Sequence, residues 1–153
     1  MKHIYLRVLI SFLFVTAAVV ILPNCTPKTA LPRKTLAVNT PVLYTVETVT
    51  AVQAYTLVQA NKNNLDFVIL DVRTQDEFAN GHIPGSINID FLSGNFEKEI
   101  NVLDRNKIYL VYCRTGDRSK RAAEFMVKLY FRKVYNLSGG VNDWAKQGYP
   151  LIN

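Results

Sequence analysis

The chain has 153 residues, 49% hydrophobic and 20% charged, which is the size and composition of one ordinary globular domain. Seven glycines and six prolines are too few for a collagen-like or low-complexity chain, and two cysteines cannot build a disulfide framework. With only His3 and His82 added, the cysteines form no cluster at metal-ligand spacing, so we expect no zinc site. The net charge of +6 includes Lys2 and Arg7 of a targeting segment, so we expect no nucleic-acid partner for the remainder.

Residues 1–24 have the pattern of an export signal. A basic region with Lys2 and Arg7 precedes an apolar run from Val8 to Leu22. As a helix this run would cover about 22 Å, short of the roughly 30 Å hydrocarbon core of a bilayer. The pattern therefore favours a signal peptide over a permanent membrane span.

Cys25 follows this segment in the sequence Leu22-Pro23-Asn24-Cys25, which resembles a bacterial lipobox. In that motif the signal is cut before a cysteine that is then lipidated, although Gly, Ala or Ser is usual where Asn24 stands. The alternative is cleavage nearby, with Cys25 as an incidental thiol. We expect an exported protein, in the bacterial periplasm or anchored to a membrane as a lipoprotein.

Residues 25–41 are predicted to form a tether. This stretch contains Pro27 and Pro32 and has no apolar periodicity. Its three basic residues could touch anionic headgroups, whereas a plain solvated linker is the simpler interpretation. The folded domain is then expected over residues 42–153.

From Val42 onward, short apolar runs alternate with helical patterns, which is typical of β-α units and a mainly parallel sheet. Five strands are predicted, at residues 42–46, 67–70, 86–89, 108–112 and 134–137. Five helices are predicted between and after them. The first has Thr48 or Thr50 as its cap and runs through about residue 61, and the others lie at residues 75–80, 95–103, 119–130 and 140–147. Thr74 and Glu77 form a capping box at the start of the second helix. The predicted fold class is an α/β domain with a central, mainly parallel, five-stranded sheet and helices on both faces.

The loop after the fourth predicted strand carries the chemistry. Ligands in open parallel sheets bind beyond the carboxyl ends of the strands, and the next helix directs its free N–H groups at this loop. Nearby arginines and a helix N-terminus favour a thiolate, and Gly116 allows a positive φ so that N–H groups converge as an anion-binding nest. A buried, inert cysteine is the alternative, but it would not need two arginines and a glycine beside it. The loop reads Cys113-Arg114-Thr115-Gly116-Asp117-Arg118.

Four blocks, in the same order along the chain, resemble the single-domain rhodanese family of sulfurtransferases. The resemblance covers about residues 44–150. The blocks are Asp71-Val72-Arg73; Glu77-Phe78 with Gly81-His82-Ile83-Pro84-Gly85-Ser86-Ile87-Asn88; Tyr112 to Ser119; and Leu137-Ser138-Gly139-Gly140 with Trp144 and Gly148-Tyr149-Pro150.

This resemblance implies that Cys113 attacks the outer sulfur of a small anionic donor such as thiosulfate and carries a persulfide to a thiol acceptor. The loop residues from Arg114 to Arg118 would bind the persulfide, with Arg114 at the rim and Arg118 pointing inward or bracing the loop. Asp71 and Arg73 would tie a strand end to the site or form a structural ion pair. No cofactor or metal is expected, and we expect a monomer.

Three further residues receive roles. Asp117 is expected to cap the helix rather than act as a base, because a thiolate already formed needs no proton removed. His82 lies in a turn of the family signature and is expected to be architectural. Trp144 is expected to pack in the core.

Two rival functions remain open. A cysteine phosphatase or arsenate reductase of the related fold has five residues between cysteine and arginine, whereas four separate Cys113 from Arg118. A non-enzymatic persulfide carrier or partner-binding module of the same family is the other alternative.

Overall fold

The computed structural model describes residues 44–153. The predicted signal peptide of residues 1–24, the lipidation residue Cys25 and the tether of residues 25–41 lie outside this part of the chain. Within residues 44–153, no helix is both long and apolar enough to span a bilayer.

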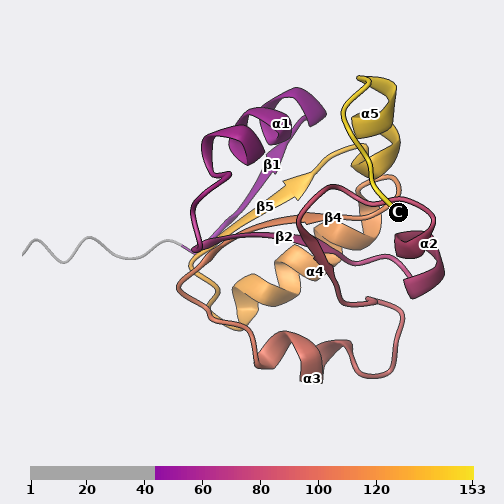
Figure 1. The fold of residues 1–153 in the computed structure, drawn as a ribbon. Coiled ribbons are helices and arrows are strands. Elements are labelled where there is room, and N and C mark those ends of the chain that lie inside the picture. Colours follow the sequence, from indigo (N-terminus) through magenta and orange to yellow (C-terminus); the bar gives the residue numbers. More distant parts are fainter. Residues whose placement is uncertain (1–43) are drawn as a thin grey trace, which may run out of the picture. The chain divides into compact units, whose positions relative to one another are not determined.

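The described residues form five strands and five helices that alternate along the chain (Figure 1). The strands are β1 (Val46–Val49), β2 (Phe67–Asp71), β3 (Ser86–Asn88), β4 (Ile108–Tyr112) and β5 (Lys133–Leu137). The helices are α1 (Ala51–Ala60), α2 (Gln75–Ala79), α3 (Phe96–Asn101), α4 (Asp117–Lys128) and α5 (Gly140–Lys146). The strand order is β1-β5-β4-β2-β3 and every pairing is parallel, which confirms the predicted sheet.

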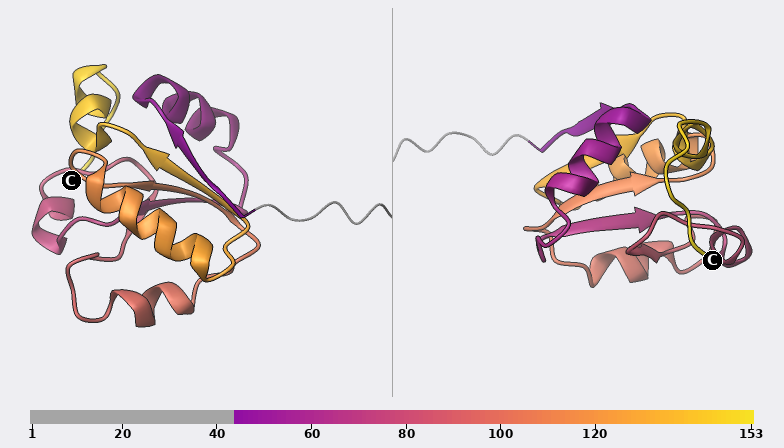
Figure 2. Two further views of the ribbon diagram at one scale, coloured as in Figure 1. Left: turned by 180° about the vertical axis from the view of Figure 1, so that it is seen from behind. Right: turned by 45° about the horizontal axis from the view of Figure 1, so that its top comes forward.

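Strand β4 lies at the centre of the sheet and is buried on both faces because its residues alternate between two cores. Tyr109 and Val111 pack with α3 and α4, whereas Leu110 and Tyr112 pack with α1 and α5. The two further views show these helix pairs on opposite faces of the sheet (Figure 2). This three-layer packing fixes the carboxyl ends of the central strands, where the Cys113 loop begins.

The ends of several elements differ from the prediction. Strand β1 spans Val46–Val49 and shares only Val46 with the strand predicted at residues 42–46, of which residues 42–43 lie outside the described part of the chain, because its pairing with β5 places Val46–Val49 opposite Val134–Leu137. Helix α4 begins at Asp117, two residues before the predicted start at Ser119, because Gly116 forms its N-cap. The predicted capping box of Thr74 and Glu77 is present at α2.

Candidate functional site

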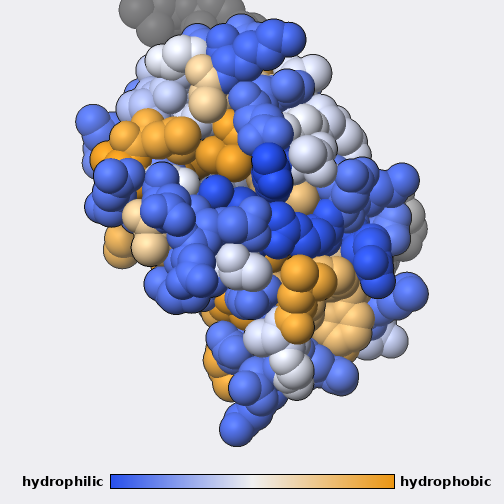
Figure 3. All heavy atoms as spheres, turned by 90° about the vertical axis from the view of Figure 1, so that its right-hand side faces the viewer, coloured by the Kyte–Doolittle hydropathy of each residue, from blue (hydrophilic) through white to orange (hydrophobic). Residues whose placement is uncertain are grey.

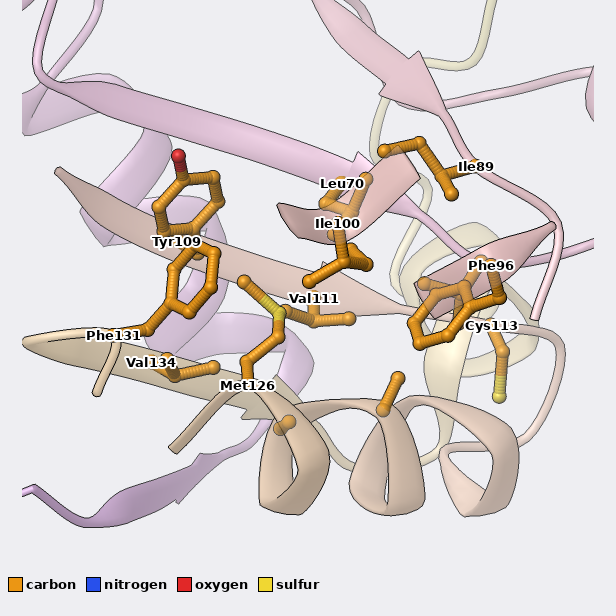
Figure 4. Packing of buried hydrophobic residues seen from close by; sticks show 13 residues of the cluster. Leu70, Ile89, Phe96, Ile100, Tyr109, Val111, Cys113, Met126, Phe131 and Val134 are labelled. Atoms are coloured by element: carbon orange, nitrogen blue, oxygen red, sulfur yellow. The ribbon is translucent and has the colours of Figure 1, made fainter. Parts of the chain in front are cut away.

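Cys113 is the first residue after β4, and its side chain is completely buried. Figure 3 views the domain from this side, where a band of hydrophilic residues runs between hydrophobic patches. In Figure 4 the Cys113 sulfur points toward the first turn of α4. The sulfur therefore lies below the surface at the carboxyl edge of the sheet.

The loop turns back over the sulfur at Gly116. The Gly116 N–H donates to Cys113 Sγ at 3.2 Å, and Gly116 has a φ of 99°, a conformation that strongly favours glycine. Any side chain here would also press against the backbone of residues 137–139, with contacts as short as 3.0 Å. Glycine at position 116 therefore serves two purposes: it adopts the positive φ of the turn, and it leaves room for the backbone at the end of β5.

Helix α5 fixes the peptide planes of the same loop. The N–H groups of Val141 and Asn142, at the start of α5, donate to the carbonyls of Cys113 (2.8 Å) and Arg114 (3.2 Å). In a trans peptide the N–H points opposite to the C=O, so these bonds leave the N–H groups of Arg114 and Thr115 facing away from α5. A Cβ on Gly140 would overlap the Cys113 carbonyl oxygen, which explains the glycine at this position.

Burial alone would raise the pKa of the Cys113 thiol, but hydrogen bonds to the sulfur lower it below its ordinary value. The donors are the Ser119 hydroxyl and the backbone N–H groups of Ser119, Thr115 and Gly116. The single proton of the Ser119 hydroxyl is shared among three acceptors: Cys113 Sγ at 3.5 Å, the Gly116 carbonyl at 3.0 Å and Oδ1 of Asn136, a polar residue buried in β5, at 2.7 Å. The site therefore favours negative charge on the sulfur.

Arg118 braces the loop, one of the two roles anticipated for it. Its guanidinium donates to both carboxylate oxygens of Glu77 in α2, at 2.7 and 2.8 Å. Hydrogen bonding from Arg118 lowers the pKa of the Glu77 carboxyl to about 2. This pair ties α2 to the start of α4 across the mouth of the site.

Arg114 lies on the rim, where its side chain is exposed. It borders a shallow pocket of about 240 Å³ with Arg73, Glu77, Asn80, Val141 and Asn142. Thr115 is also exposed. The rim thus offers an exposed cation above a buried sulfur.

Asp71 and Arg73 form a buried ion pair at the end of β2, with Nη2 and Oδ2 separated by 2.6 Å. The Arg73 guanidinium also donates to the Gly81 carbonyl at 2.8 Å and lies over the Tyr112 ring. These contacts join the strand end to the turn that follows α2. Asp71 and Arg73 thus form the structural ion pair that was one of the two roles expected for them from the sequence.

The expected capping role of Asp117 is wrong. Asp117 is the first residue of α4, and the N-cap is Gly116, which has no side chain to cap with. The turn over the sulfur requires a positive φ at the residue before the helix, so glycine occupies the position that a capping side chain would need. The Asp117 carboxylate instead accepts a hydrogen bond from the Thr115 hydroxyl at 3.1 Å.

His82 and Trp144 make packing and hydrogen-bonding contacts that stabilise the fold. The His82 ring stacks on Phe78 with centroids 3.8 Å apart, and its Nδ1 lies 3.0 Å from the Phe78 carbonyl oxygen. Trp144 is buried and donates from its indole nitrogen to the Pro150 carbonyl. Among residues 44–153, no group of three or more His, Cys, Asp or Glu side chains is placed to hold a metal.

Sequence reasoning gave no role to Ser119 or Asn136 and gave Glu77 only its part in the capping box, yet all three support the loop. Ser119 and Glu77 stand within the motif blocks, but their partners lie 17 and 41 residues away in sequence. Asn136 carried one usable signal, a polar residue inside an apolar strand. A buried polar group needs a partner, so such a residue marks a hydrogen-bond network.

Comparison with known proteins places this site in a family. A family model described as Rhodanese-like domain matches residues 53–147. The thiosulfate sulfurtransferase GlpE of Stutzerimonas stutzeri is 37% identical over 87 residues, which cover 57% of this chain and 77% of GlpE.

Two other matches add to this. The protein of Bacillus subtilis named "Putative sulfur carrier protein YrkF" is 42% identical over 77 residues, but these cover 50% of this chain and only 40% of YrkF. The crystal structure of a rhodanese-related protein from Thermoplasma volcanium superposes with a TM-score of 0.60 at 32% identity, covering 69% of this chain and 97% of that one. The fold expected from the motifs is confirmed.

We expect Glu77→Gln to destabilise the domain in a pH-dependent manner. Because the pKa of the Glu77 carboxyl falls from an ordinary 4.5 to about 2 on folding, its stabilisation is complete above about pH 4.5 and is lost as the pH falls toward 2. Partial solvent screening leaves roughly 1–2 kcal/mol at neutral pH. Denaturant unfolding at neutral pH and at about pH 3 measures this. Glu124→Gln, at an exposed position of α4, is the matched control. Equal loss at both pH values would contradict the role of the pair.

We expect Ser119→Ala to raise the pKa of the Cys113 thiol, because one hydrogen-bond donor to the sulfur is removed while burial stays. The loss of fold stability should be about 1–3 kcal/mol, because the buried Oδ1 of Asn136 loses its donor as well. Thiolate absorbance against pH, corrected with the Cys113→Ser protein, reports the pKa. Ser138→Ala is the control, since that hydroxyl donates to the Val49 carbonyl instead. An unmoved titration in Ser119→Ala would show that the hydroxyl does not act on the sulfur.

Proposed function

Because the chain belongs to the family of rhodanese-like domains, we propose that it is a sulfurtransferase that moves a sulfane sulfur through a persulfide on Cys113. The observation that carries this proposal is the sulfur itself, buried beneath a loop whose N–H groups and Ser119 hydroxyl donate toward it. Such a site stabilises a sulfur anion without a metal ligand or a general base.

In the first step the Cys113 thiolate attacks the outer sulfur of a donor such as thiosulfate. A sulfur–sulfur bond forms to Cys113, the donor's own sulfur–sulfur bond breaks, and sulfite leaves with the electron pair. In the second step an acceptor thiolate attacks the terminal sulfur and takes it away as a persulfide, which restores the Cys113 thiolate. The cycle is ping-pong and redox-balanced.

Each loop residue has a proposed part in this cycle. The backbone from Arg114 to Arg118, with Gly116 at its turn, would hold the terminal sulfur anion, while Thr115 and Asp117 close the loop through their own hydrogen bond. Arg114 would attract the anionic donor. Asp71 and Arg73 would support the strand end from below.

The Glu77–Arg118 pair supports sulfur transfer over phosphate chemistry. A cysteine phosphatase needs a free guanidinium to bind a tetrahedral oxyanion, whereas both terminal nitrogens of Arg118 donate to Glu77. The loop is also one residue shorter than a phosphatase loop. Sulfite release from thiosulfate without hydrolysis of an aryl phosphate is the expected pattern, and the reverse pattern would overturn the proposal.

A sulfur carrier is the second candidate, and the name of the Bacillus subtilis relative supports it. A carrier would accept one sulfur atom and release it to a partner, without rapid cycling on small molecules. Turnover with excess dithiol acceptor distinguishes an enzyme, which cycles many times, from a carrier, which releases a single equivalent of sulfur.

We further propose that the protein is exported, with Cys25 as its lipid attachment site. Residues 1–24 carry the signal pattern, and the lipobox-like Leu22-Pro23-Asn24-Cys25 ends it. The domain would then act outside the cytoplasm, tethered by residues 25–41.

Cys113→Ser should abolish sulfur transfer, with a loss of at least about a thousandfold, because a hydroxyl at neutral pH is not ionised. Sulfite release and the intact mass after donor treatment are the measurements. The parent protein should gain about 32 Da for one added sulfur and the variant should gain none. Unchanged circular dichroism would exclude misfolding, and retained turnover would refute the assignment.

Arg114→Ala should raise the KM for thiosulfate about tenfold and change kcat little, because it removes an exposed cation that binds donor and transition state alike. The loop backbone should remain in place, since the Arg114 carbonyl is held by the Asn142 N–H. Arg132→Ala removes the same charge on the opposite edge of the sheet and serves as the control. A KM equal to that of the control would count against this role.

Cys25→Ala should release the protein from membranes into the soluble fraction and remove acyl mass from the N-terminus. Cell fractionation with mass analysis of the purified chain measures both, and Cys113→Ser is the control for loss of a thiol. Membrane association that persists in Cys25→Ala would show that the apolar segment, and not a lipid on Cys25, anchors the protein.

A further inference from the structure

The start of β1 and three helix-to-strand connections lie at the amino ends of the strands, on the side of the sheet opposite Cys113 (Figure 1). We call this surface the amino edge and define it as residues 44–47, 61–66, 102–107 and 128–133. Three hydrogen bonds join these segments directly. Lys107 Nζ donates to the Leu65 carbonyl, Arg105 Nε donates to the Leu129 carbonyl, and the Arg132 N–H donates to the Arg105 carbonyl. The amino edge is therefore one continuous surface.

The most exposed large hydrophobic residues of the described chain gather there. Leu65 is 87% exposed, Val102 is 82% exposed and Tyr130 is 69% exposed, more than any other large apolar residue in residues 44–153. Tyr130 also holds a φ of 66°, a left-handed conformation that is costly for a bulky residue. Its ring packs edge-on against Tyr44 instead of entering the core. Such side chains gain nothing from facing water.

The amino edge is also more positively charged than the rest of the described domain. The amino edge carries six basic and three acidic residues, a net charge of +3. The rest of residues 44–153 carries seven basic and nine acidic residues, a net charge of −2. The basic residues of the amino edge are Lys62, Arg105, Lys107, Lys128, Arg132 and Lys133, of which Lys133 pairs with Glu47. The surface thus combines positive charge with exposed apolar side chains.

The preceding chain joins the domain at this edge. Tyr44, the first described residue, contacts Tyr130, and β1 begins two residues later. Upstream lie the apolar run from Val8 to Leu22 and the lipobox-like Cys25. Residues 25–41 bridge at most about 60 Å when fully extended, so an anchor at either place keeps the amino edge within reach of a bilayer.

We propose that the amino edge is a docking surface for an anionic bilayer. Its lysines and arginines bind headgroup phosphates, and Leu65, Val102 and Tyr130 enter the interfacial layer, where tyrosine and aliphatic groups are stabilised. The apolar residues favour lipid over nucleic acid, the other common polyanion, because phosphates along a helix offer them no apolar environment. This proposal goes beyond sulfur transfer and does not depend on it.

Lysine footprinting of the full chain on vesicles tests the proposal. Vesicles of phosphatidylcholine with roughly one-third phosphatidylglycerol are compared with pure phosphatidylcholine vesicles, and acylation of each lysine is read by mass spectrometry. Lys62 and Lys128 are exposed on the amino edge, whereas the equally exposed Lys120 and Lys146 lie in α4 and α5, away from it. On anionic vesicles we expect acylation of Lys62 and Lys128 to fall at least about threefold, with Lys120 and Lys146 unchanged.

Variants of the amino edge, with a matched control, test which residues contact the vesicle. Leu65→Ser should weaken the protection of Lys128, and Lys62→Glu with Arg132→Glu should abolish it. Lys120→Glu with Lys146→Glu changes the net charge equally and should leave it intact. Equal protection on neutral vesicles, absence of protection on anionic ones, or stronger protection by a double-stranded oligonucleotide would each overturn the proposal. Because no sulfur donor is present, these outcomes are independent of the proposed activity.

Discussion

The site depends on how two helices hold one short loop. The first N–H groups of α5 bind the carbonyls of Cys113 and Arg114, so those peptide planes cannot rotate, and Gly116 closes the loop at the start of α4. Without these bonds the loop's own N–H groups would have no reason to converge on a sulfur. The glycine at position 140 belongs to this constraint, because any side chain there would separate α5 from the loop.

The two arginines of the loop, Arg114 and Arg118, have different surroundings. Arg118 is held by Glu77, so it supports the loop, and its charge is largely balanced by the carboxylate. Arg114 is exposed on the rim, where the proposed function assigns it the anionic donor. Backbone N–H groups of the loop donate to the sulfur, and the Arg118 guanidinium also interacts with it while it is paired with Glu77.

Much of the fold follows from local pattern. The continuous apolar runs before Asp71 and Cys113 predicted the central strands β2 and β4 closely, because strands buried on both faces need such runs. The start of β1 was less predictable, because its partner in β5 sets its register. The Ser119–Asn136 and Glu77–Arg118 pairs join residues far apart in sequence, so only the packed helices reveal them. The position of Cys113 between a predicted strand and a predicted helix made it the candidate nucleophile. The capping role of Asp117 was predicted wrongly, because the turn needs a left-handed residue at position 116, and that glycine is the N-cap.

A sheet whose strands all run in one direction has two unlike ends. Here the chain joins at the end where the strands begin, and the Cys113 sulfur lies where they finish. A molecule held by its N-terminal segment would consequently present its thiol to the surrounding solution. Under the proposed sulfur transfer, donor and acceptor molecules would then reach the loop from the aqueous side, at the end of the sheet opposite the proposed anchor.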